Sequence, residues 1–162
     1  MLKKTTLLIL IFCILFLETK AQNYFAAIGT RLGYGLGISG KWSPNQNLNF
    51  LEGMLNVDVF SGKYGRYSGL ALTALYERHF EMPRSFDGFN WYLGAGGGTT
   101  FGPQFFNLSV EPILGLEYSI DRFPLCFSVD YKPRIYLLKR NSPGDTAIEP
   151  RDAGFSIRYY FN

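Results

Sequence analysis

Long stretches of this chain alternate between apolar and polar residues, and this period of two is the pattern of extended strands with two different faces. The clearest case is PLCFSVDYKPRIYLL at 124–138. One face of this segment is almost wholly apolar, whereas the other carries Asp130, Lys132 and Arg134 in a row. Charges of both signs on one face and none on the other favour a strand between hydrocarbon and a polar interior.

The same alternation recurs along the chain and predicts strands at 48–60, 67–81, 89–101, 107–120, 124–138 and 153–161. The predicted fold class is all-β: a closed antiparallel up-and-down transmembrane β-barrel of about eight strands. The segment 24–42 precedes these strands. It is either one long strand, which its unbroken parity favours, or two short strands with a glycine-rich reversal near Tyr34–Gly37, which an even strand count requires.

The N-terminal residues are typical of a signal peptide that is cleaved after Ala21. Two lysines precede an apolar run at 7–17, which is too short to span a bilayer, and small residues precede the cut. The chain is therefore predicted to comprise a signal peptide at 1–21 and one β-barrel domain at 22–162. Most of the net charge of +3 lies in the leader, so the domain offers no case for nucleic-acid binding.

A glycine motif at 35–42, GLGISGKW, matches the spacing of a dinucleotide-binding turn and most of a phosphate-binding loop. Both motifs need a helix directly after the glycines. Pro44 follows instead, and Trp42 stands where the phosphate loop needs serine or threonine. We therefore expect no nucleotide and no other cofactor.

The polar faces of the predicted strands are expected to form an ion-pair network inside the barrel, because an unpaired buried charge is costly. An eight-stranded barrel is narrow enough for side chains to fill, so no open pore is expected. The expected interior network consists of Arg31, Glu52, Asp58, Glu77, His79, Glu111, Glu117, Asp130, Lys132, Arg134 and Arg158.

We expect no enzymatic activity, no catalytic residue and no metal site, although two alternatives stay open. The first is a membrane-embedded lipid-modifying enzyme similar to a lipid A deacylase, for which His79 is the only histidine. Parity sends His79 inward, however, and Glu81 stands where such a deacylase motif has serine. The second is a secreted soluble ligand-binding β-barrel, since soluble sheets alternate too.

Aromatic residues near the predicted strand ends suggest two interfacial girdles. One set is Trp42, Phe80, Trp91 and Phe123, and the other is Tyr64, Tyr67, Phe101, Phe105 and Phe106. Pro112 and Pro133 cannot donate to a ladder, and we expect a β-bulge at each.

The closing GFSIRYYFN resembles the C-terminal assembly signal of outer-membrane barrels through Phe155, Ile157, Tyr159 and Phe161, with Asn162 after the last aromatic residue. The stretches AIGTRLGYGLGISGKW, LTALYERHF, NWYLGAGGG, ILGLEYSID and VDYKPRIYLL are similar to the small outer-membrane β-barrels of the OmpA/OmpX type.

This resemblance implies a place in the outer membrane of a Gram-negative cell, contact with its lipids, and insertion by the barrel-assembly machinery. The implied role is structural, or one of surface interaction through extracellular loops that are longer than the periplasmic turns. The longest predicted loop is 139–153, and we expect it either to bind an unidentified ligand or to be a bare connection.

Overall fold

The computed structural model describes residues 24–45, 47–62, 65–83, 86, 88–103, 105–120, 123–141 and 147–161, with the side chains of 59–67 left out. The predicted leader at 1–21 lies outside the described residues. Within them no helix has the length and apolar character to cross a bilayer. The strands are β1 (Ala26–Leu32), β2 (Gly35–Trp42), β3 (Asn49–Gly62), β4 (Gly65–Glu81), β5 (Phe89–Phe101), β6 (Phe106–Ser119), β7 (Leu125–Tyr131), β8 (Arg134–Arg140), β9 (Ile148–Glu149) and β10 (Ala153–Phe161).

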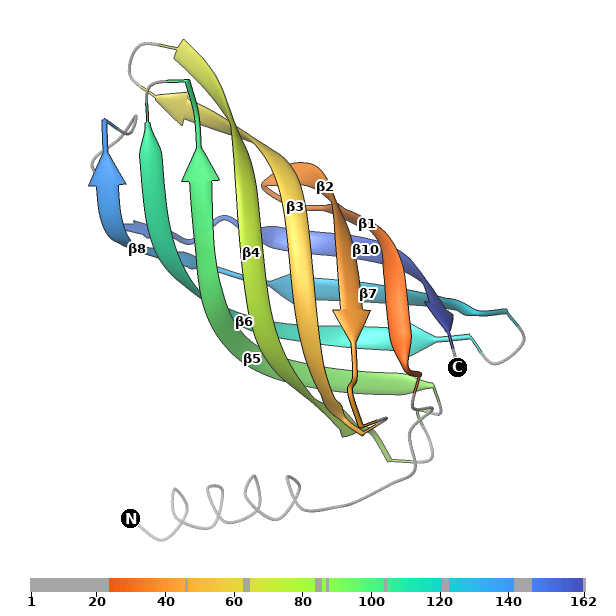
Figure 1. Ribbon diagram of the computed structural model, residues 1–162. Helices are drawn as coiled ribbons and strands as arrows, with labels where there is room; N and C mark the ends of the chain where they lie inside the picture. Colours follow the sequence, from red (N-terminus) through yellow and green to blue (C-terminus); the bar gives the residue numbers. More distant parts are fainter. Residues whose placement is uncertain are drawn as a thin grey trace, which may run out of the picture.

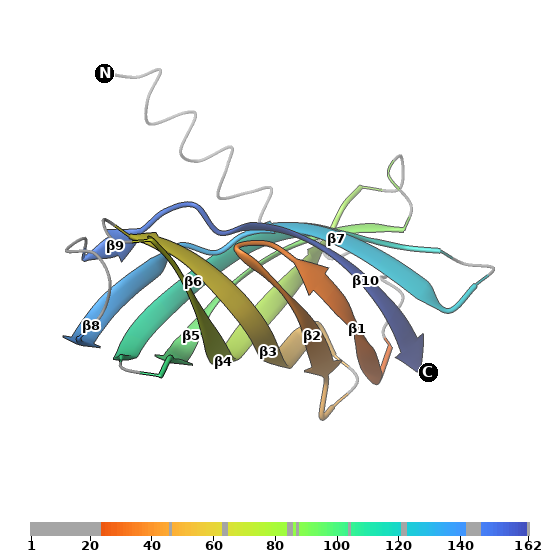
Figure 2. The same cartoon turned by 90° about the horizontal axis from the view of Figure 1, so that it is seen from above.

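These segments form a closed antiparallel up-and-down β-barrel of eight strands, which confirms the predicted fold class (Figure 1). β7 and β8 together make the seventh strand, and β9 and β10 make the eighth. The barrel closes where β1 pairs with β10, from Ala26 opposite Phe161 to Leu32 opposite Phe155. Seen from above, β7 and β10 lie across the barrel from β3 and β4 (Figure 2).

The two ends of the barrel carry different parts of the chain. The terminal end holds the start of β1, the end of β10 and the connections at 43–48, 82–88 and 120–124. The distal end holds the connections at 33–34, 63–64, 102–105 and 141–147. The distal connections are not generally longer than the terminal ones, because β3, β4, β8 and β9 extend into the segments predicted as loops.

The segment 24–42 forms two strands, β1 and β2, which settles the alternative that the sequence left open. The reversal lies at Gly33–Tyr34, where the Gly33 N–H donates to the Gly35 carbonyl at 2.8 Å. The glycine motif at 35–42 is therefore strand β2 and is followed by no helix.

The two prolines lie at a break in the wall between β6 and the β7–β8 strand. Leu114 pairs with Tyr131 on one side of the break and Val110 pairs with Ile135 on the other. The register is the same on both sides, so Pro112 stands opposite Pro133. Neither residue has an N–H to donate, and the ladder stops there without a shift. The predicted bulges at the prolines are therefore wrong.

A register shift does occur one step farther along this pair of strands, between Leu108 and Ser109. Leu108 pairs with Leu138 and Ser109 pairs with Tyr136, which leaves Leu137 as the extra residue. Leu137 and Leu138 are both exposed on the outer wall as a result.

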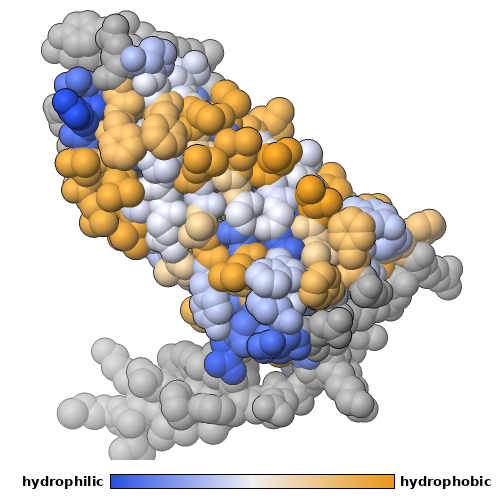
Figure 3. Space-filling view, in the orientation of Figure 1, coloured by the Kyte–Doolittle hydropathy of each residue, from blue (hydrophilic) through white to orange (hydrophobic). Residues whose placement is uncertain are grey.

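Apolar side chains cover the outside of the barrel, and polar side chains fill its inside. Leu36, Leu114 and Leu137 are 62%, 55% and 65% exposed, and Figure 3 shows apolar side chains spread over the visible strands. Most of the buried side chains are instead polar or charged. This distribution is the reverse of that in a water-soluble protein.

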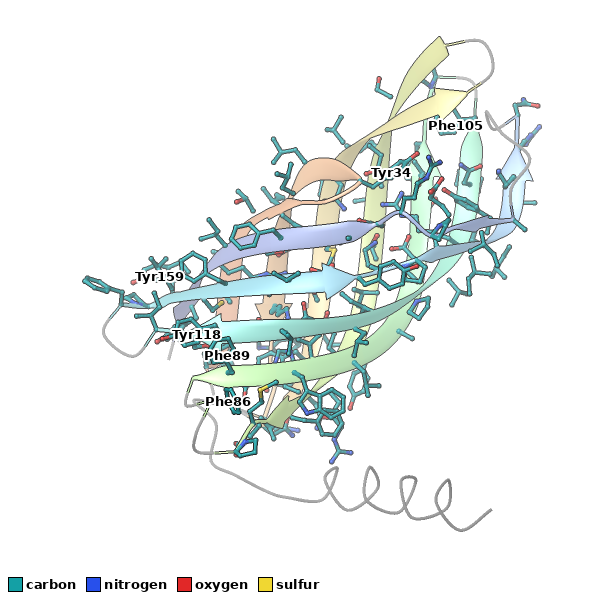
Figure 4. The ribbon with its side chains drawn as sticks, turned by 180° about the vertical axis from the view of Figure 1, so that it is seen from behind. Tyr34, Phe86, Phe89, Phe105, Tyr118 and Tyr159 are labelled. Atoms are coloured by element: carbon teal, nitrogen blue, oxygen red, sulfur yellow. The ribbon has the colours of Figure 1, made fainter. Side chains whose placement is uncertain are left out.

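Exposed aromatic residues gather at the terminal end, where Figure 4 shows Phe89, Tyr118 and Tyr159. The predicted second girdle is less complete. Phe101 lies on the outside at the distal end, but Phe105 is only 7% exposed and packs beneath Gly69 and Gly102, so its assignment to a girdle is wrong. The side chains of Tyr64 and Tyr67 lie outside the described residues.

Gly96 and Gly97 of β5 provide a matched test of how closely the neighbouring strand approaches the inner face of β5. A Cβ on inward-facing Gly96 would overlap the carbonyl oxygen of Ala74 on β4, whereas one on outward-facing Gly97 has its nearest neighbour, the Ser109 carbonyl oxygen, at 3.9 Å. We expect Gly96→Ala to lower the free energy of unfolding by about 1–3 kcal/mol, the usual cost of overpacking. Urea unfolding followed by tryptophan fluorescence measures this, and Gly97→Ala should leave the midpoint unchanged. Equal effects of the two substitutions would contradict the account.

Candidate functional site in the barrel interior

The barrel interior is the candidate functional site because it gathers nearly all the chemically active side chains of the strands. All eleven residues of the predicted interior network are at most 3% exposed. They divide into two groups along the barrel, which we call the distal network and the terminal network.

Asp152, just before β10, is the centre of the distal network, and its carboxylate is fully buried. Its Oδ1 accepts hydrogen bonds from Arg31 Nη1 at 3.0 Å and from the Tyr34 backbone N–H at 3.1 Å. Its Oδ2 lies 3.3 Å from Lys132 Nζ and 3.3 Å from Arg134 Nη2. One carboxylate therefore ties together the β1–β2 turn, the β7–β8 junction and the start of β10.

Two further carboxylates share the cations of the distal network. Arg31 Nη2 donates to Asp130 at 2.5 Å, and Lys132 pairs with Glu111. Arg134 Nε lies 3.5 Å from Glu111 Oε1. The complete distal network is Arg31, Asp58, Glu111, Asp130, Lys132, Arg134 and Asp152.

Lys41 of β2 is the centre of the terminal network. Its ammonium lies 2.8 Å from Glu77 Oε2 and 3.2 Å from Glu117 Oε2. It also lies 3.5 Å from His79 Nε2 and 4.0 Å from the centre of the Tyr92 ring. Two carboxylates and an aromatic face thus surround one buried cation.

Arg158 of β10 connects the terminal network to three other strands, β2, β3 and β7. Its Nη2 donates to Glu52 at 2.5 Å, its Nε to the Ser39 hydroxyl at 2.6 Å and its Nη1 to the Ser128 hydroxyl at 2.7 Å. The complete terminal network is Lys41, Glu52, Glu77, His79, Glu117 and Arg158.

Some ion pairs join strands that are not neighbours in the wall. Arg134 of β8 pairs with Asp58 of β3, and Lys41 of β2 pairs with Glu117 of β6. Such pairs place long charged side chains across the lumen, and they connect opposite walls of the barrel through its interior.

Aromatic side chains pack around the terminal network at the terminal end. The Tyr24 ring lies 4.9 Å from Phe50 and 5.6 Å from Tyr160, and Phe50 lies 4.5 Å from His79. The Tyr24 hydroxyl donates to Glu117 at 2.8 Å. Tyr24, two residues before β1, therefore reaches into the barrel and joins the ion pairs to the apolar cluster.

Sequence reasoning missed Lys41, Asp152 and Tyr24. The inward parity of Lys41 was visible, since it continues the alternation from Arg31, but the strand count of 24–42 was open. Asp152 was placed in the predicted loop because the last predicted strand began at 153, although Asp152 has the inward parity of Ser156 and Arg158. Tyr24 belonged to the segment 24–42, but it has the parity of the outward-facing Ile28 and Leu32, so the alternation did not place it inside.

His79 faces the interior, as its parity predicted, and is 2% exposed. Its ring is stacked on Tyr92 at 4.8 Å and its Nε2 lies 3.3 Å from Glu77. This position is remote from the outer wall that a lipid substrate would contact. Among the described residues, no three histidine, cysteine, aspartate or glutamate side chains are placed to hold a metal ion.

The four residues that resemble an assembly signal lie on the outer face of β10. Phe155, Ile157, Tyr159 and Phe161 are all exposed, while Ser156, Arg158 and Tyr160 between them point inward. The four side chains therefore form one apolar stripe beside the seam at which the barrel closes.

The predicted loop 139–153 is only partly described, since residues 142–146 lie outside the described part of the chain. Its ends belong to the wall, through β8 and β9. Glu149 accepts a hydrogen bond from exposed Arg151 at 2.9 Å, and this bond raises the pKa of the arginine.

Comparisons of this chain with protein-family models, with curated proteins and with solved structures found no match.

Removing the Asp152 carboxylate should destabilise the barrel strongly, because three buried cations would lose a partner. We expect Asp152→Ala to lower the free energy of unfolding by about 3–5 kcal/mol, the cost of breaking a buried ion pair. Denaturant unfolding with circular dichroism measures the loss. Arg151→Gln, next along the chain, removes an exposed charge and its bond to Glu149, and should lower the midpoint only slightly, because exposed ion pairs contribute little to stability. An Asp152→Ala variant as stable as the parent protein would show that this carboxylate is not the centre of the network.

Proposed function

We propose that this chain is an integral outer-membrane β-barrel protein, filled by side chains, with a structural role or a role in surface interaction at its distal end. The observation that supports this most directly is the reversed polarity of the barrel. Most exposed strand residues are apolar, and most charged residues pair inside. Lipid is the solvent that favours this arrangement.

The ion pairs support a closed lumen. Arg134 and Asp58 meet from opposite walls in the distal half, and Lys41 and Glu117 meet in the terminal half. Both levels of the barrel thus carry cross-lumen contacts between long side chains. We therefore propose that the barrel forms no open pore, as its strand number also favours.

We propose that the terminal end faces the periplasm and the distal end faces outward. An even number of strands places both ends of the barrel domain on the same side, and an exported chain inserted from the periplasm keeps them there. The barrel-assembly machinery and outer-membrane lipids are then the expected partners. An unidentified ligand of the 139–153 segment stays a proposal on the distal side.

The alternatives draw less support from the same observations. A soluble ligand-binding barrel would place the apolar outer wall in water, and large exposed apolar surfaces are rare on soluble monomers. A lipid-modifying enzyme needs reactive groups at the lipid surface, and His79 points to the interior.

Expression in a Gram-negative host tests the proposal. We expect the protein in the outer-membrane fraction of the cells. It should resist extraction by carbonate and urea, because its apolar wall is held in lipid. Unboiled protein should migrate differently from boiled protein on gels, since a closed barrel resists detergent unfolding.

A variant that lacks residues 1–21 is the control, because it cannot be exported and should fail both assays. Recovery of the full chain in the soluble fraction, or release from membranes by salt alone, would overturn the proposal.

A further inference from the structure

The outer wall of the barrel carries almost no charge. Among the described outward-facing side chains of the strands, only Arg78 and Arg140 are charged. Arg140 is the last residue of β8 at the distal end, and Arg78 lies near the terminal end of β4. Arg78 breaks an apolar stripe, and a cation at such a position needs a partner.

Arg78 lies on a stack of two aromatic side chains. Its guanidinium carbon is 5.5 Å from the centre of the Phe80 ring. The Phe80 ring is stacked on Trp91 of β5 at 4.3 Å, with 14° between the planes. Phe80 and Trp91 are direct partners across β4 and β5, which lie side by side in Figure 1.

The Arg78 side chain is exposed, and no described residue forms an ion pair with it. Its partners across the strands are Asn49 on β3 and Leu93 on β5, and neither carries a charge. The guanidinium therefore keeps its hydrogen-bond donors available on the outside of the barrel. Its planar fork of donors suits the oxygens of a phosphate group.

We propose that Arg78, Phe80 and Trp91 form a binding site on the outer wall for the phosphate of an anionic phospholipid. The inference rests on the proposed function, because it requires this wall to lie in a bilayer. The site lies near the terminal end, which places it at the headgroup level of the periplasmic leaflet. Tryptophan is enriched at that level, and an arginine side chain can extend along apolar surface to reach it.

Tryptophan fluorescence can report on this site directly, because Trp42 is the only other tryptophan. A Trp42→Phe variant leaves Trp91 as the single reporter. This variant is reconstituted into phosphatidylcholine vesicles that contain a small fraction of brominated phosphatidylglycerol or, separately, the same fraction of brominated phosphatidylcholine. Bromine quenches only nearby indoles, so the quenching measures which lipid lies beside Trp91.

We expect brominated phosphatidylglycerol to quench Trp91 as if its local concentration were roughly fivefold above its fraction in the vesicle. This factor corresponds to the attraction of one cationic side chain to an anionic lipid surface. Arg78→Gln should remove the enrichment, and Arg78→Lys should keep part of it. Arg140→Gln is the matched control, since it removes the charge at the other end, and the enrichment should be unchanged.

Two outcomes would overturn the inference and are distinguishable from each other. Equal quenching by both brominated lipids would show no preference for the anionic headgroup, so the inference would fail while the membrane barrel stays intact. No quenching by either lipid would show that Trp91 does not face lipid, and the proposed function would fail as well. A gel shift on boiling, measured for each variant, shows that the barrel has folded.

Discussion

Every charged side chain sealed inside a narrow barrel must find its partner there, and the rest of this structure follows from that constraint. Each of the seven interior carboxylates lies in an ion pair with at least one of five interior cations. Asp152 alone lies against three cations and a backbone N–H, which come from the β1–β2 turn region and from the β7–β8 junction. The buried pairs are therefore specific to one register of the strands, because a slip by one residue would turn each charge to the outside.

Glycine supplies the space that these interior side chains need. A Cβ at Gly115 would overlap the Tyr92 ring, and one at Gly154 would overlap the guanidinium of Arg31. The inner face of the wall thus combines very large polar side chains with glycines, which have no side chain. This combination explains how a small barrel can hold arginine side chains and still close.

The sequence predicted the faces of the strands better than their connections. The period of two depends only on local chain geometry, so it placed Glu111 and Arg158 inside and Phe155 outside before any pairing was known. Asp152 has the inward parity of Ser156 and Arg158, but the predicted strand began one residue later, at 153, so Asp152 was left in the predicted loop. Pro112 and Pro133 each favour a bulge when taken alone, and only the register reveals that they stand opposite each other.

The central claim is that the apolar face of each strand meets lipid, and β6 allows the most direct measurement of it. Nitroxide labels are placed one at a time at 113–118 in a Cys126→Ser background, and collisions with oxygen and with a water-soluble nickel complex are recorded in vesicles. The account predicts oxygen accessibility that alternates with a period of two, with maxima at Leu114 and Leu116, and little access for nickel at those positions. High nickel access at Leu114 and Leu116 would contradict it, because these side chains would then face water.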